Sequence, residues 1–226
     1  INYVPGLFKI FDEIIVNAND NKNRIDNKIK NKEKGLSKMT KLKVNIFKLK
    51  DEDMPEKYAI SVLNDGDGID VALHPTEKIF IPQMIFGELL TSGNYNKSEE
   101  KVTGGKNGYG AKLANIFSKY FCIETADKHR KLHYKQIYRN NMLQKTEPVI
   151  TKFTGKPYTK ITFIPDYERF SMKDLTDDFI ALFKKRTMDM TFCSQGSIMV
   201  SFNEILLNKL TSIDYMKMYL PIEYSV

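Results

Sequence analysis

Glu13, Asn17 and Asn21 recur at every fourth position in a segment rich in apolar residues near the start of the chain. At about 100° per residue, this spacing places the three polar side chains in one stripe along a helix. The stripe drifts into the edge of the apolar face, where a carboxylate or an amide without a partner is costly. Neighbouring backbone groups could supply the partners, which would make the stripe structural. A ligand, a metal ion or ordered water would instead make it part of a binding site.

Three glycine-bearing segments follow the stripe, at 65–69, 91–94 and 104–112. The third opens a predicted helix, where glycine lets backbone N–H groups converge on an anion. Lys106 and Lys112 add positive charge there. Neither the P-loop spacing nor the dinucleotide-binding spacing is present. A glycine-rich turn alone is usually only a turn, but the order of stripe, aspartate–glycine turn and glycine-rich segment is more specific than any one of them.

The elements that must position these residues form a mixed pattern. Apolar spacing predicts helices over 5–20, 82–90, 111–117, 173–188 and 212–219, and strands over 41–50, 58–63, 120–125, 132–138, 160–164 and 197–202. Helices and strands do not alternate strictly, so an α+β fold is favoured over a doubly wound α/β fold. Residues 21–40 are rich in Asn and Lys, which predicts a mobile low-complexity loop.

The net charge of +7 is concentrated in one segment. Residues 21–50 contain eleven Lys or Arg residues against Asp26 and Glu33, so the rest of the chain is slightly acidic. The segment could contact DNA, but a solvated insertion is the favoured interpretation because its lysines lack interleaved aromatic side chains. The basic charge therefore does not indicate that the whole chain binds nucleic acid.

Composition limits the class of protein. A hydrophobic content of 42% can fill a sizeable core, and no apolar run reaches membrane-spanning length. His74, His129 and His133 show no metal-ligand spacing. Because the chain begins at Ile1 rather than Met, we expect a fragment of a longer protein.

The order of the motifs resembles that of the GHKL ATPases, which include gyrase B subunits, topoisomerase II, MutL, heat-shock chaperones and sensor histidine kinases. Residues 11–18 resemble the asparagine-bearing first motif of this superfamily, 65–69 its adenine-binding turn and 159–163 its late threonine motif. The resemblance implies a two-layer α+β (Bergerat) fold, with a mixed, mainly antiparallel sheet and helices on one face.

Within the superfamily, the chain resembles eukaryotic-type topoisomerase II most. This closer resemblance rests on residues 4–13, 85–92 and 102–112. It covers nearly the whole chain except 22–40, which looks like an insertion. It implies one ATP-binding domain over 1–226, with the link to a transducer domain starting near 210–226.

The resemblance implies a role for each residue of the stripe and the turn. Glu13 would be the general base that activates the attacking water, and Asn17 would complete the Mg²⁺ shell. Asn21 would lie near the phosphates or the ribose. Asp65 would accept a hydrogen bond from the adenine amino group, and Thr159 would hold Asp65 and a water against the adenine.

The other implied ATP-binding residues surround the adenine or close over the triphosphate. They are Ala18, Ile69, Ile85 and Phe86 around the adenine, Thr91, Ser92, Gly93 and Asn94 beside the ribose and phosphates, and Gly105, Lys106, Asn107, Gly108, Tyr109, Gly110, Ala111 and Lys112 in the glycine lid.

The resemblance also implies cofactors and partners. ATP and Mg²⁺ would bind this domain, while the full-length enzyme would form a homodimer in the nucleus and pass one DNA duplex through another, with no membrane contact. The lysine that reaches the γ-phosphate would lie on the transducer domain, so we expect this chain to hydrolyse ATP poorly. Two alternatives are a MutL-like or chaperone-like clamp ATPase without strand passage, and a non-enzymatic DNA-binding module.

Overall fold

Nine strands form one mainly antiparallel sheet in the computed structural model, which describes residues 3–52, 54–88 and 109–220. The strands are β1 (Lys41–Asp51), β2 (Met54–Asp65), β3 (Ser118–Asp127), β4 (Leu132–Arg139), β5 (Gln144–Lys145), β6 (Val149–Lys152), β7 (Tyr158–Pro165), β8 (Met199–Phe202) and β9 (Ile205–Leu206). Their spatial order is β5-β4-β3-β7-β2-β1-β8-β9, and β6 pairs with β4. Strand β8 runs parallel to β1.

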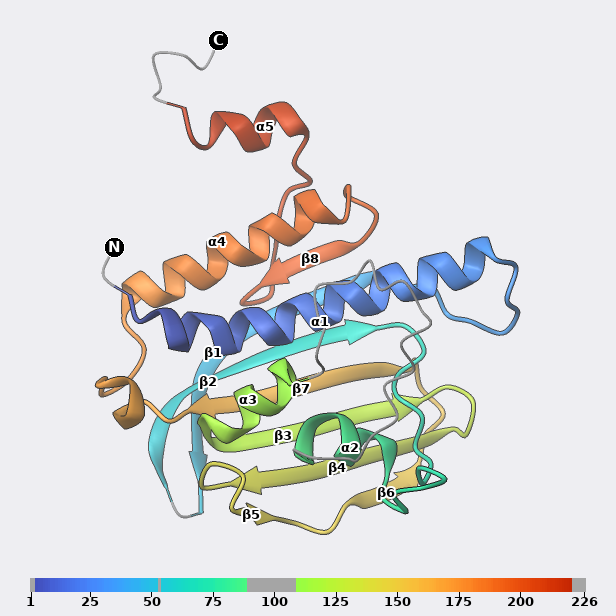
Figure 1. Cartoon of the computed structure of the whole chain (residues 1–226). Helices are drawn as coiled ribbons and strands as arrows, with labels where there is room; N and C mark the ends of the chain where they lie inside the picture. The colour runs from blue at the N-terminus through green and yellow to red at the C-terminus, as the bar shows by residue number, and fades with distance from the viewer. Residues whose placement is uncertain (1–2, 53, 89–108, 221–226) are drawn as a thin grey trace.

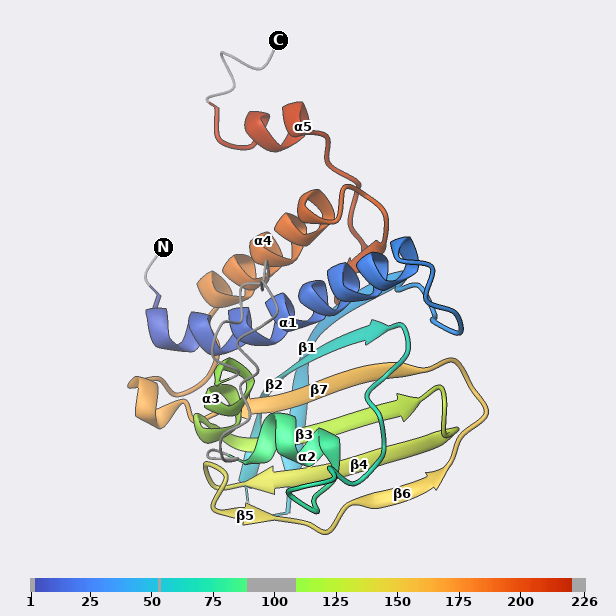
Figure 2. The same ribbon diagram turned by 45° about the vertical axis from the view of Figure 1, so that its right-hand side comes forward.

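Helices cover one face of this sheet (Figure 1). The described helices are α1 (Pro5–Lys30), α2 (Ile81–Gly87), α3 (Gly110–Ile116), α4 (Asp177–Cys193) and α5 (Ser212–Lys217), with a short 3₁₀ helix at Glu168–Phe170. Helix α1 crosses β1 and β2, while α2 and α3 lie over β3 and β4, and α4 lies beside α1 and β8 (Figure 2). Helix α5 lies beyond α4, away from the sheet. The expected α+β architecture is therefore confirmed.

The core lies between the sheet and the helices. Val62 on β2, Ile161 on β7 and Ile123 on β3 stand opposite one another in register, and all three are buried. Phe11 and Ile15 from α1 join the same buried cluster. Residues two positions further along these strands share the same face, because side chains alternate along a strand.

Helix α1 is longer than the sequence predicted. It continues through residues 21–30, where we expected a mobile loop, and only 31–40 lie outside the helix. Ile25 is fully buried and extends the apolar stripe of the helix, and Lys22 forms an ion pair with Asp26 at 2.8 Å. The composition of the segment concealed this amphipathic pattern, because its single buried isoleucine lies among Asn and Lys residues.

Most of the other expected elements are confirmed, with shifted ends. Helix α4 begins at Asp177 instead of 173, since Asp177 and Asp178 suit the first turn, where the helix dipole favours negative charge. The short strands β5, β6 and β9 were not predicted. The predictions that concern residues 89–108 fall outside the part of the chain that the structure describes. None of the described helices combines the length and apolarity needed to cross a membrane.

Candidate nucleotide site

Glu13 and Asn21 mark the two ends of the polar stripe on α1. Glu13 lies against the first residue of α3, because a Cβ atom added to Gly110 would overlap the Glu13 carboxylate. Asn21 lies beside the aspartate–glycine turn, with its amide nitrogen 3.8 Å from the position of a Cβ on Gly66. The structure therefore brings together the stripe, the turn and the helix that follows the glycine-rich segment, as the sequence predicted.

The Glu13 carboxylate has a cation beside it. Lys9 lies 2.8 Å from Glu13 and 3.4 Å from Asp12, and Arg186 of α4 donates to Asp12 at 2.6 Å. Hydrogen bonding to Glu13 raises the pKa of Lys9 most, against the lowering effect of burial. Burial, followed by the nearby Glu13 charge, raises the pKa of Asp20. Glu13 is thus the centre of a charged cluster on a half-buried part of α1.

Asn17 lies one helical turn from Glu13 and is half-buried. Its amide makes no hydrogen bond to another described residue. Within the described ranges, no three His, Cys, Asp or Glu side chains are grouped so that they could hold a metal ion. Mg²⁺ takes oxygen ligands and usually keeps phosphates and waters in its shell, so one amide oxygen fits that chemistry. The residues fit Mg²⁺ when it arrives with a phosphate ligand.

The aspartate–glycine turn needs its glycines. Gly66 and Gly68 have φ angles of 125° and 74°, and a Cβ on Gly68 would overlap the carbonyl oxygen of Ala126. The backbone N–H of Ile69 then donates to the Thr125 hydroxyl at 2.9 Å. The turn is thereby fixed against β3, at the same end of the sheet as Asn21 of α1.

The Asp65 carboxylate is bonded to residues at the start of β1. It accepts hydrogen bonds from the backbone N–H groups of Thr40 and Lys41 at 2.6 and 2.8 Å, and from the Thr40 hydroxyl at 2.5 Å. These bonds direct Asp65 toward the start of β1 and use its acceptor oxygens. We therefore correct the interpretation of Asp65: its geometry is that of a structural residue that joins β2 to β1.

The neighbouring Asn64 lies on the helix-facing side of β2, and sequence reasoning missed it. It is 6% exposed and shares the face of Ile60 and Val62. In the strand register it stands opposite Thr159, whereas Asp65 stands opposite Tyr158. The period-2 alternation of β2 was the available signal, because it places 60, 62 and 64 on one face.

Thr159 belongs to a short row of polar residues across three strands. Its hydroxyl lies 3.1 Å from that of Thr125, which also donates to the carbonyl of Tyr158. Asn64, Thr159 and Thr125 thus lie on the same face of the sheet as Val62, Ile161 and Ile123. Each is two residues along its strand from the apolar residue of that strand. Thr159 and Asp65 are both described by the structure, and no hydrogen bond joins their side chains.

The predicted adenine wall is only partly formed by the described residues. Ala18 is buried on α1, and Ile69 is half-buried and packs on the core. Phe86 is buried against Phe121, with ring centroids 6.1 Å apart, and its carbonyl accepts a hydrogen bond from Asn115. Ile85 is exposed, so it is free to contact a ligand.

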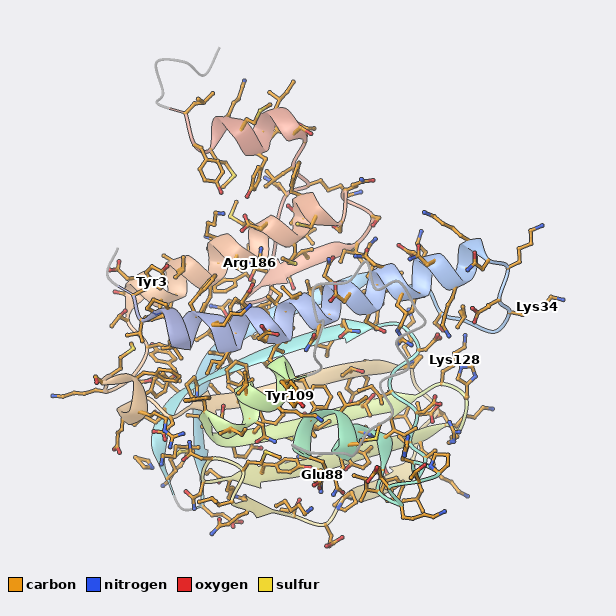
Figure 3. The ribbon with its side chains drawn as sticks, in the orientation of Figure 1. Tyr3, Lys34, Glu88, Tyr109, Lys128 and Arg186 are labelled. Atoms are coloured by element: carbon orange, nitrogen blue, oxygen red, sulfur yellow. The ribbon has the colours of Figure 1, made fainter. Side chains whose placement is uncertain are left out.

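The described part of the predicted lid begins at Tyr109, which is exposed at the start of α3 (Figure 3). Ala111 and Lys112 are buried. Burial lowers the pKa of Lys112, and the charge of Glu88 opposes this shift. The remaining predicted contact residues lie outside the described residues: Thr91, Ser92, Gly93, Asn94, Gly105, Lys106, Asn107 and Gly108.

The chain is similar in sequence to DNA topoisomerase 2 from several organisms. It is 48% identical to "DNA topoisomerase 2" of Pisum sativum over 97% of its own length and 14% of that protein. It is 46% identical to "DNA topoisomerase 2" of Acanthamoeba polyphaga mimivirus over 98% of its length and 16% of that protein. The chain therefore spans about one seventh of these relatives. No model of a protein family matches the chain.

Solved structures give the same result. The ATPase region of Saccharomyces cerevisiae topoisomerase II matches with a TM-score of 0.79 and 43% identity, over 97% of this chain and 53% of that one. The ATPase domain of Thermus thermophilus gyrase B matches with a TM-score of 0.60 at 20% identity, which shows the shared fold alone. The chain thus belongs to the type II DNA topoisomerases and corresponds to part of their ATPase region.

Proposed function

We propose that the chain binds Mg²⁺–ATP between α1, the 65–69 turn and α3, and that Glu13 activates the water that attacks the γ-phosphate. The observation that supports this most directly is the packing of the Glu13 carboxylate against Gly110. It places a base candidate beside the helix that follows the glycine-rich segment. A general base has to reach the reacting water, and the position of Glu13 beside this helix supports that role.

For the adenine, we propose Asn64 in place of Asp65. An amide oxygen accepts a hydrogen bond from the adenine amino group as a carboxylate does. Asn64 faces the helix layer opposite Thr159, whereas the Asp65 carboxylate is occupied by Thr40 and Lys41. Thr159 keeps its proposed role near the adenine, now as a neighbour of Asn64.

For the phosphates, we propose Asn17, Asn21 and Lys112 as the side-chain contacts. Asn17 would hold Mg²⁺, which neutralises phosphate charge when bound. Lys112 is a buried cation with a lowered pKa, and an added anion would favour its charged form. The resemblance assigns the other lid contacts to Tyr109, Gly110 and the residues before them.

The activity of the whole protein is also a proposal, because the chain spans a small part of its relatives. We propose that the longer protein forms a homodimer, that ATP closes its gate around a DNA duplex, and that hydrolysis resets the gate. A nuclear location rests on the eukaryotic relatives. The clamp ATPase and the non-enzymatic DNA-binding module, which were the sequence-based alternatives, have no observation that favours them over a topoisomerase.

Replacing the proposed base tests the function. Glu13→Gln should retain binding of a nonhydrolysable ATP analogue and lose about 100-fold or more in single-turnover hydrolysis. Glu168→Gln is the matched control, because it makes the same chemical change at an exposed residue of the 3₁₀ helix and should hydrolyse normally. Equal hydrolysis by the Glu13 variant and the wild type would exclude Glu13 as the base.

A further inference from the structure

Four exposed lysines lie at the end of α1 and in the following loop. Lys30, Lys32, Lys34 and Lys38 are exposed, and none forms an ion pair with another residue in the part of the chain that the structure describes. We call these four residues the basic patch. Some other lysines of residues 21–50 are paired: Lys43 pairs with Glu204 at 2.9 Å, whereas Lys50 also forms no ion pair with a described residue.

The patch rests on ordered structure and is not a free coil. The α1 helix carries it outward as far as Lys30. Beyond the helix, the backbone N–H of Ser37 donates to Asp67 at 2.5 Å, and Lys128 donates to the carbonyl of Gly35 at 2.5 Å. The loop is therefore attached both to the aspartate–glycine turn and to the β3–β4 turn. Figure 3 shows Lys34 and Lys128 at the same end of the molecule.

We propose that the basic patch binds the phosphate backbone of duplex DNA. Duplex DNA carries one negative charge per roughly 1.7 Å of its axis, so exposed lysines that contact its phosphates release the counterions condensed on the DNA. The family of the chain acts on DNA, which makes DNA the polyanion that the longer protein meets. The contact reads no base sequence, because lysine contacts to phosphate position the protein without specifying the sequence.

The side chains around the patch favour a duplex over other polyanions. Residues 22–38 are all described by the structure, and Ile29 is the only large apolar side chain among them that is exposed. A helix that binds a membrane surface presents several apolar or aromatic side chains to the acyl chains. Binding of single strands depends on aromatic platforms for base stacking, which this segment does not contain.

The patch lies at the opposite end of α1 from the proposed general base Glu13. Lys30 follows Glu13 by seventeen residues on the same helix, so the two lie roughly 25 Å apart along its axis. Loss of DNA binding and loss of ATP binding can therefore be measured independently. The result of the DNA-binding test therefore does not depend on whether Glu13 is the general base.

The test compares salt dependence of DNA binding by the 226-residue chain and a patch variant, using a labelled 30-base-pair duplex. The variant carries Lys30→Gln, Lys32→Gln, Lys34→Gln and Lys38→Gln. We expect at least about tenfold weaker binding at low salt, and a slope of log K against log salt that is smaller by about 0.9 for each phosphate that the variant no longer neutralises.

A control variant separates a specific patch from net charge. It carries Lys50→Gln, Lys135→Gln, Lys173→Gln and Lys184→Gln, four exposed lysines that also form no ion pair with described residues. It should retain the wild-type slope, and both variants should bind the ATP analogue as the wild type does. Three results would each overturn the proposal. The patch variant and the wild type could show equal salt slopes, or the patch and control variants could lose DNA affinity equally. The chain could also bind anionic phospholipid vesicles but not the duplex.

Discussion

The ammonium group of Lys9 lies 2.8 Å from the carboxylate of Glu13, one turn away on α1. The charge of Lys9 thereby restrains the residue that we propose as the general base. Arg186 forms an ion pair with the adjacent Asp12 at 2.6 Å. Lys9 lies 3.4 Å from Asp12, so Glu13 is its nearer partner. The pair thus favours one orientation of the half-buried Glu13 carboxylate on the helix.

Removing the cation should therefore disturb turnover more than binding. We expect Lys9→Met to lower single-turnover hydrolysis by about tenfold, since a general base that is poorly positioned transfers its proton less efficiently. The Kd of a nonhydrolysable ATP analogue should change little. Lys9→Arg retains the charge and should recover most of the rate. A methionine variant with normal hydrolysis would show that the ion pair has no positioning role.

Gly110 permits the close approach of Glu13 to α3. Gly110→Ala should lower hydrolysis by about 100-fold, because the added Cβ would displace the carboxylate. Gly155→Ala is the control, since its Cβ would also meet a side chain, the ring of Phe153, although less closely, in the loop before β7. Equal rates for both alanine variants in a single-turnover assay would contradict the proposed geometry.

Asn64 and Asp65 can be distinguished by separate measurements of binding and stability. Asn64→Ala should weaken binding of the ATP analogue about tenfold or more, because the adenine amino group loses its acceptor. Asp65→Ala should instead lower the free energy of unfolding by about 1–2 kcal/mol, since it removes the bonds to Thr40 and Lys41.

Calorimetric titration and denaturant unfolding of both variants provide the test. Isotherms are compared only under conditions where each variant is fully folded. If Asp65→Ala lost nucleotide binding while Asn64→Ala kept it, Asp65 would be the adenine acceptor after all.

The Asp51–Arg139 pair predicts a pH-dependent part of the stability. Arg139 donates to both carboxylate oxygens, at 2.6 and 3.0 Å, and this bonding holds the pKa of Asp51 below its ordinary 3.8. A lowered folded-state pKa stabilises the fold above the unfolded-state pKa and loses that effect as pH falls through the folded-state value.

Asp51→Asn should therefore be less stable than the wild type by about 1–3 kcal/mol near pH 6. The difference should shrink as the pH falls below about 3.8. Urea unfolding at several pH values measures it. A difference between the two proteins that grows as the solution becomes more acidic would have the wrong sign for this account.

The sequence allowed the fold class, the main strands and the stripe on α1 to be predicted, because these depend on regular spacing of apolar and polar residues. It did not separate Asn64 from Asp65 as the adenine acceptor that we propose, since both are polar and only the register of β2 against β7 distinguishes them. The end of α1 was missed because burial of Ile25 depends on the turn at Gly66, which lies far along the sequence.

The central claim is that the stripe of Glu13, Asn17 and Asn21 belongs to a Mg²⁺–ATP site. Calorimetric titration of the 226-residue chain with a nonhydrolysable ATP analogue, with and without Mg²⁺, tests it most directly. We predict saturable binding that strengthens when Mg²⁺ is present, and loss of this strengthening in Asn17→Leu. The absence of measurable binding at millimolar analogue, or binding that Mg²⁺ does not change in the wild type, would contradict the claim.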